Sequence, residues 1–127
     1  KINKKNKIIK KKLFKKFTTK EGSPDGMTLD KDKNLWVAHF HGACISVFNK
    51  KAELLTRINF PAKNITNCAF GGKNNNELFV TTAKKGMNKA EMQKYRYSGN
   101  LFSLKTNMKG ILQKKYALSN EKKRSLL

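Results

Sequence analysis

The chain has 127 residues, enough for one small domain, and its formal net charge is +21. No run approaches the roughly 18 apolar residues that a membrane span needs. No apolar run with a cleavage site follows the first lysines, so neither a membrane span nor a signal peptide is expected. These absences favour a cytoplasmic protein.

Lysine carries almost all of the positive charge, because Arg57, Arg96 and Arg124 are the only arginines. Arginine grips phosphate and base edges with paired hydrogen bonds, whereas lysine acts as a point charge. Lysine is also abundant together with asparagine, isoleucine and phenylalanine, which is typical of a compositional drift across a proteome. The charge therefore predicts a solvated surface rather than a nucleic-acid site, although residues 1–16 form the densest basic run.

The expected elements are short β-strands separated by polar or glycine-containing turns. The first candidate is the basic stretch of residues 8–17, and only residues 86–97 favour a helix or a long loop. The later strands are expected over residues 35–38, 45–48, 54–60, 78–81, 101–104 and 111–118. Pro24 and Pro61 are expected between strands, where a missing N–H does least harm.

The strands recur as a repeat. Residues 35–38 (Leu-Trp-Val-Ala) return 43 residues later as residues 78–81 (Leu-Phe-Val-Thr), each copy after a polar turn. A glycine-led strand follows each copy, at residues 42–47 and 99–104. Four short strands in about 40–45 residues is the period of a propeller blade. The sequence therefore predicts an all-β chain built of propeller blades, with a small independent β-sandwich as the alternative.

Residues 22–30 (Gly-Ser-Pro-Asp-Gly-Met-Thr-Leu-Asp) and residues 34–38 resemble a hallmark segment of the regucalcin (senescence marker protein) and gluconolactonase family. Similar segments follow in the family's order as far as about residue 118, at residues 66–72, 78–83, 86–87, 98–102 and 109–111. The resemblance implies the C-terminal portion of a six-bladed β-propeller, of which this chain would hold about two blades and one strand.

On this interpretation the chain has four parts. Residues 1–21 are a basic segment with the last strand of a preceding blade, and residues 22–61 form a complete blade. Residues 62–118 form the final blade, with a long loop over 84–98, and residues 119–127 are a basic tail. Two blades and a piece cannot close a ring, so the chain alone is expected to be unstable or to aggregate.

The resemblance implies a metal-dependent hydrolase of sugar lactones, similar to gluconolactonase. In that family the aspartate of Pro-Asp-Gly is a metal ligand, and here it is Asp25. One divalent metal ion is expected, with Ca²⁺, Zn²⁺, Mg²⁺ and Mn²⁺ as candidates, because such an ion acidifies water and polarises a lactone carbonyl. The remaining ligands, a glutamate and asparagines, are expected on other blades, so the chain alone would be inactive.

Alternatives remain open for the site and for the function. Pro-Asp-Gly is also an ordinary turn sequence, so Asp25 can serve structure alone. A non-catalytic calcium-binding or regulatory propeller and a basic nucleic-acid-binding fragment are the other candidate functions. Cys44 and Cys68 lack the spacing of a redox or disulfide pattern, and we expect two reduced, half-buried thiols.

His39, His41 and the loop over residues 84–98 are expected at the same mouth as Asp25. The loop that enters the first strand of a blade and the loop that leaves its second strand open at one end. Two histidines at i and i+2 share one face of a strand, which also occurs in zinc sites. We expect both histidines to be polar surface residues instead, with His41 facing a substrate.

Three further residues are candidates for the substrate face. Thr66 and Asn67 stand where Pro24 and Asp25 stand in the previous blade, and Tyr95 lies on the long loop. Each has a structural alternative: a hydrogen bond for the first two, and packing of the loop for the tyrosine. The large aromatic residues are expected in the core between blades; they are Trp36, Phe70 and Phe79.

Overall fold

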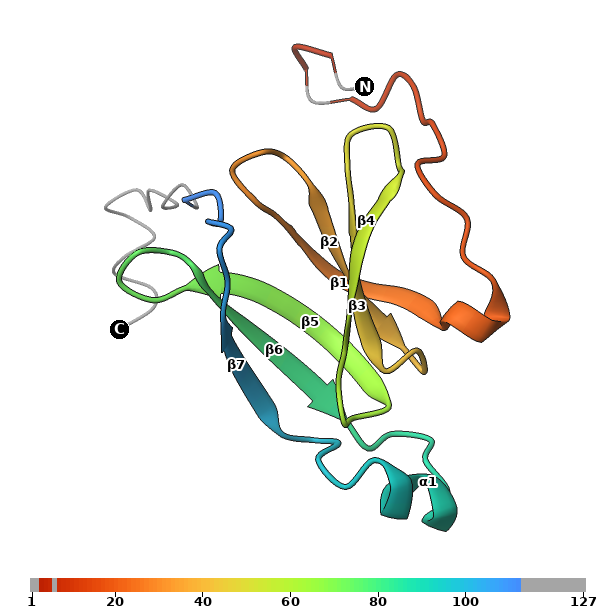
Figure 1. Ribbon diagram of the computed structural model, residues 1–127. Helices are drawn as coiled ribbons and strands as arrows, with labels where there is room; N and C mark the ends of the chain where they lie inside the picture. Colours follow the sequence, from red (N-terminus) through yellow and green to blue (C-terminus); the bar gives the residue numbers. More distant parts are fainter. Residues whose placement is uncertain (1–2, 6, 113–127) are drawn as a thin grey trace, which may run out of the picture.

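The computed structural model describes residues 3–5 and 7–112. Its elements follow the chain in the order η1 (Thr19–Glu21, a 3₁₀ helix), β1 (Ser23–Leu29), β2 (Leu35–Phe40), β3 (Cys44–Phe48), β4 (Leu54–Asn59), β5 (Asn64–Gly71), β6 (Glu77–Ala83), α1 (Lys89–Lys94) and β7 (Leu101–Lys105) (Figure 1). The expected all-β class is confirmed. The helix suggested for residues 86–97 is present as α1.

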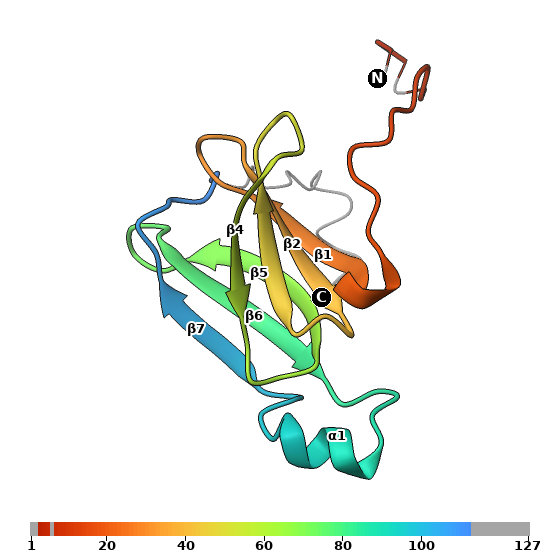
Figure 2. The ribbon, with the colours of Figure 1, turned by 45° about the vertical axis from the view of Figure 1, so that its right-hand side comes forward.

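The strands form two antiparallel sheets, one with the order β1-β2-β3-β4 and the other with the order β5-β6-β7. Each strand pairs with the next along the chain, so each sheet is a meander. The sheets lie against each other with β5 beside β1 and β2 (Figures 1 and 2). The fourth strand expected over residues 111–118 falls almost entirely outside the described residues.

Alternation within the strands builds the core between the two sheets. Trp36 packs edge-to-face on Phe70 with ring centroids 5.1 Å apart, which joins one sheet to the other. The buried members of this core are Trp36, Ala38, Ile45, Val47, Phe60, Ala62, Ile65, Cys68, Leu78 and Val80. Trp36 and Phe70 are therefore in the expected core. Phe79 alternates with Leu78 and Val80, so it is half-buried on the opposite face of its sheet.

The turn between β1 and β2 is held by a fully buried carboxylate, that of Asp30. It accepts hydrogen bonds from the backbone N–H of Asn34 (2.9 Å), from the Asn34 side-chain amide (2.9 Å) and from Trp36 Nε1 (3.0 Å). A buried carboxylate is tolerated when its oxygens are hydrogen-bonded in this way. The polar turn of the repeat is therefore part of the folded hairpin and fixes the indole in the core.

Residues 8–17 do not form the strand that their pattern suggested, and within the described residues the first strand is β1. The segment runs along the outer face of the first sheet, where Phe14 and Phe17 pack edge-to-face on Phe48 with centroids 6.5 and 5.8 Å apart. A strand needs a neighbouring strand with which its backbone can form hydrogen bonds. A segment that lies on the face of a sheet has no such neighbour, so an alternating pattern of side chains is not sufficient to make it a strand.

Pro24 lies within β1 and not between strands as expected, whereas Pro61 does follow a strand. Because β1 is an edge strand and Pro24 lies near its start at a β-bulge, this is a position at which a strand tolerates proline. None of the helices in the described part of the chain has the length and apolarity needed to cross a membrane.

Candidate functional site

The strands β1 and β5 lie side by side, and both begin at the same end of the molecule (Figures 1 and 2). Because the sheets are antiparallel, β2, β4 and β6 end there, and β3 and β7 begin there. The loops over residues 41–43, 60–63 and 84–100 therefore gather at this end. We call it the Asp25 end, because Asp25 lies near the start of β1.

A β-bulge interrupts β1 and β5 at corresponding positions. The register of β1 with β2 shifts between Pro24 and Met27, and that of β5 with β6 shifts between Ile65 and Asn67. A bulge adds an unpaired residue and re-aims a side chain out of the regular alternation. Asp25 and Asn67 are both exposed at these bulges. Pro-Asp-Gly is thus part of a bulged strand, and the interpretation of it as a turn is wrong.

Gly26 permits the close approach of the two bulges. A Cβ atom at Gly26 would lie 2.1 Å from Asn67 Oδ1 and 2.7 Å from Asn67 Cα, which is closer than atoms can pack. The same Oδ1 accepts a hydrogen bond from the backbone N–H of Cys68 at 2.9 Å, which fixes the amide. The glycine of the motif therefore positions Asn67 beside β1, a role that its sequence did not reveal.

The carboxylate of Asp25 is exposed and makes no hydrogen bond or ion pair with any described residue. Two other carboxylates near this end are engaged: Glu21 pairs with Arg57 at 3.2 Å, and Glu91 pairs with Lys63. An available carboxylate suits one position in the oxygen ligand set of a hard cation. Within the described ranges no group of three or more His, Cys, Asp or Glu residues could hold a metal, so Asp25 fits one ligand and not a whole set.

The other predicted substrate-face residues differ in their exposure and in their hydrogen bonds. Thr66 is half-buried, and its hydroxyl lies 2.8 Å from that of Thr81, which favours the structural alternative. Asn67 is exposed beside β1, and its side-chain N–H groups are not hydrogen-bonded to the described part of the chain. His41 is exposed in the loop after β2, and Tyr95 is half-buried at the end of α1.

His39 is not a surface residue, contrary to expectation, because its side chain is fully buried. Its Nδ1 lies 2.7 Å from the backbone oxygen of Glu21, and its ring packs edge-to-face on Phe17 at 5.0 Å. Burial lowers the pKa of His39 below its usual value. Its Nε2 is buried and has no partner in the described chain. His39 belongs to the strand face beneath the N-terminal segment, whereas His41 lies beyond the strand end with φ at 66°, so the two do not share a face.

Both cysteines are free, as expected, but they are fully buried rather than half-buried, at 2% exposure for Cys44 and 3% for Cys68. Burial raises the pKa of the Cys44 thiol and raises that of Cys68 to about 12. Only the thiolate is a nucleophile or a metal ligand, so both residues are inert members of the packing.

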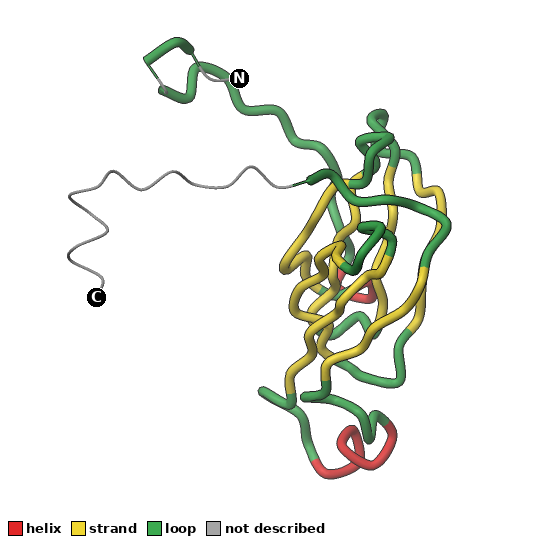
Figure 3. Tube along the Cα trace, turned by 90° about the vertical axis from the view of Figure 1, so that its left-hand side faces the viewer, coloured by secondary structure: helices red, strands yellow, loops and turns green. Residues whose placement is uncertain are grey.

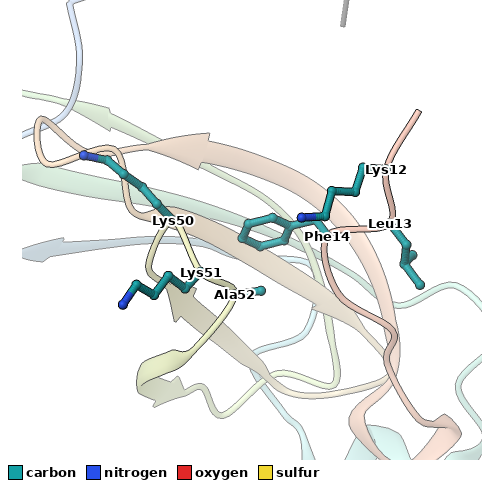
Figure 4. Close-up of a pocket in the computed structure, with 6 residues that line it drawn as sticks. All are labelled: Lys12, Leu13, Phe14, Lys50, Lys51 and Ala52. Atoms are coloured by element: carbon teal, nitrogen blue, oxygen red, sulfur yellow. The ribbon is translucent and has the colours of Figure 1, made fainter. Parts of the chain in front are cut away.

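One cavity lies away from the Asp25 end, between the N-terminal segment and the β3–β4 turn (Figure 4). Its volume is about 250 Å³, and it is lined by Lys12, Leu13, Phe14, Lys50, Lys51 and Ala52. The lysine side chains point in different directions, so their ammonium groups do not converge on one position (Figure 4). The cavity contains none of the predicted site residues.

Solved structures contain the same arrangement of two sheets. Regucalcin from Agrobacterium tumefaciens superposes with a TM-score of 0.72 and 24% sequence identity, covering 77% of this chain and 33% of its own. A luciferin-regenerating enzyme superposes with a TM-score of 0.64 and 33% identity, covering 73% of this chain and 31% of its own. The fold is therefore that of a part of regucalcin-like propeller proteins. The number of blades in the complete protein stays a prediction.

The model of the SMP-30/gluconolactonase/LRE-like region matches residues 2–84. Curated relatives include "Putative sugar lactone lactonase YvrE" of Bacillus subtilis, 42% identical over 69% of this chain and 30% of its own length. Regucalcin of Danio rerio is 36% identical over 76% of this chain and 33% of its own length. The chain belongs to the SMP-30/gluconolactonase/LRE-like family, and it spans about a third of the length of these relatives.

Proposed function

We propose that the protein carrying this chain hydrolyses sugar lactones with one divalent metal ion, and that Asp25 is one of the metal ligands. The observation that carries the proposal is the exposed, unengaged carboxylate of Asp25 at the paired bulges of β1 and β5. Membership of the gluconolactonase family and a relative named as a sugar lactone lactonase support the reaction class.

Each residue at the paired bulges has a distinct part in this proposal. Asp25 supplies one oxygen ligand, and segments outside the described residues supply the others. Asn67 has its side-chain oxygen committed to the backbone of Cys68, so its N–H groups are left to donate to a sugar oxygen. When bound, the divalent ion would act as a Lewis acid on the lactone carbonyl. His41 and Tyr95 would face the substrate from the surrounding loops.

The test uses the full-length protein that contains this chain. Hydrolysis of a panel of neutral sugar lactones is measured before and after chelation, and again after adding Ca²⁺, Zn²⁺, Mg²⁺ or Mn²⁺ singly. We expect turnover that stops on chelation and returns with at least one of these ions. Turnover that survives complete removal of metal would exclude the proposed role of the ion. Metal binding without turnover of any lactone would instead indicate the non-catalytic binding protein.

A further inference from the structure

The long segment between β6 and β7, residues 84–100, forms a loop that contains α1 and lies beyond the strand ends at the Asp25 end (Figures 1 and 3). We call it the rim loop. Its helix is too short to be stable by itself. Contacts with the rest of the molecule must therefore hold it. Thr82 at the end of β6 hydrogen-bonds to Gly99 and Asn100. Two adjacent residues on another strand, Lys63 just before β5 and Asn64 at its start, connect the loop to β5.

The side chain of Asn64 is fully buried and connects two loops. Its Oδ1 accepts a hydrogen bond from the backbone N–H of His41 at 3.2 Å, and its Nδ2 donates to the backbone oxygen of Lys85 at 2.9 Å. One amide thereby joins the loop after β2 to the beginning of the rim loop. Truncation of Asn64 would leave both the backbone N–H of His41 and the backbone oxygen of Lys85 without this partner.

Lys63 holds the middle and the end of the same loop. Its backbone N–H donates to the hydroxyl of Ser98 at 3.0 Å, and Ser98 is only 1% exposed. Its ammonium group pairs with Glu91 in the first turn of α1. The hydrogen bond from Lys63 and that from the backbone of Asn88 lower the pKa of Glu91. The charge on Glu91 thus both caps α1 and ties it to β5.

His41 has a backbone conformation that needs support. Its φ of 66° lies in the left-handed region, which is uncommon for a residue other than glycine. Its ring lies beside the rim loop, because a Cβ atom at Gly86 would be 4.0 Å from His41 Cε1. The hydrogen bond that the backbone N–H of His41 donates to Asn64 Oδ1, together with the bond from Asn64 to Lys85, therefore fixes the histidine and the rim loop relative to each other.

We infer that Asn64 is a positioning residue that holds His41 and the rim loop together at the mouth above Asp25. The consequence for substrate binding rests on the proposed function, whereas the positioning of the loop does not. Two measurements on the full-length protein containing this chain separate them.

The first measurement is limited digestion with trypsin, with the cleavage sites mapped by mass spectrometry. The rim loop offers five sites for trypsin, which are Lys84, Lys85, Lys89, Lys94 and Arg96. Asn64→Ala should raise the cleavage rate within this loop about tenfold, because cleavage follows the population of the open loop. Lys63→Met removes only the ion pair and leaves the core intact, and we expect a smaller rise.

Asn74→Ala, in the exposed turn between β5 and β6, is the matched control and should leave the rate unchanged. Cleavage in Asn64→Ala and Lys63→Met that equals this control would overturn the positioning role.

The second measurement separates KM from kcat for lactone hydrolysis and adds a titration of the metal. Asn64→Ala should raise KM about tenfold while the affinity for the metal stays at the wild-type value. A parallel loss of metal affinity would indicate a general structural defect and overturn the inference. If the wild-type protein hydrolyses no lactone, the proposed function fails, and the digestion alone decides the role of Asn64.

Discussion

His39 and His41 are two positions apart, yet one is buried and the other is exposed. The sequence did not predict this difference in burial, because His39 lies within β2 whereas His41 follows the end of β2 in a left-handed conformation. The bulges at Asp25 and Asn67 were missed for a related reason. A bulge is a property of the pairing of two strands, and the sequence of one strand does not contain it.

The burial of His39 predicts a dependence of stability on pH. The ordinary pKa is 6.5, and burial lowers it in the folded state, so below pH 6.5 the unfolded chain binds a proton that the folded chain does not. The contribution of neutral His39 to the free energy of unfolding is therefore fully present above pH 6.5. It declines as the pH falls toward the lowered pKa. Arg57 and Glu21 are the charged groups that act on His39, and hydrogen bonds from Thr18 lower the pKa of Glu21 from its usual value.

Denaturant unfolding of the dilute chain between about pH 8 and pH 5, followed by the fluorescence of its single tryptophan, tests this expectation. The decline should be present in the wild type and in His41→Gln and should be reduced in His39→Gln. An equal decline in all three proteins would assign it to other groups.

At the scale of elements, the β1–β2 hairpin depends on the buried carboxylate of Asp30. Replacing it by alanine leaves Trp36 Nε1 and the Asn34 donors without their acceptor. Asp30→Ala should lower the free energy of unfolding by about 2–4 kcal/mol. Asp32→Ala, an exposed change in the same turn, should stay within about 0.5 kcal/mol of the wild type in the same denaturant titration. Similar losses in the two variants would contradict the role given to Asp30.

Most strands were predictable because alternation of apolar and polar side chains is a local signal, and β2, β3, β4, β6 and β7 fall where it indicated. The same signal failed over residues 8–17. Whether a segment pairs as a strand depends on a free neighbouring edge, which is a property of the tertiary structure. The hydrogen bonds that Lys63 and Asn64 make to the rim loop were also missed, since they join residues more than twenty positions apart.

At the scale of the molecule, the described chain exposes apolar side chains along its flanks. They include Ile8, Ile9, Leu13, Leu54, Leu55, Leu101 and Leu112. β4 is an edge of one sheet, and β7 is an edge of the other within the described residues. Exposed edges with large apolar residues favour association. The repeat pattern predicts such exposed surfaces, because a propeller blade buries its faces against its neighbours.

The isolated chain should therefore form larger species as its concentration rises, as measured by light scattering after size-exclusion chromatography. Leu54→Lys with Leu101→Lys should reduce this association, because charges at strand edges oppose pairing. A chain that stays monomeric at all concentrations would show that these surfaces need no partner.

The most direct test of the central claim is the comparison of Asp25→Asn with Asp32→Asn in the full-length protein that contains this chain. Both changes remove one exposed carboxylate, but only Asp25 lies at the paired bulges. We predict that Asp25→Asn lowers kcat/KM for lactone hydrolysis by at least about 100-fold and weakens metal binding, while Asp32→Asn changes neither. Wild-type kcat/KM and wild-type metal affinity in Asp25→Asn would contradict the proposed site.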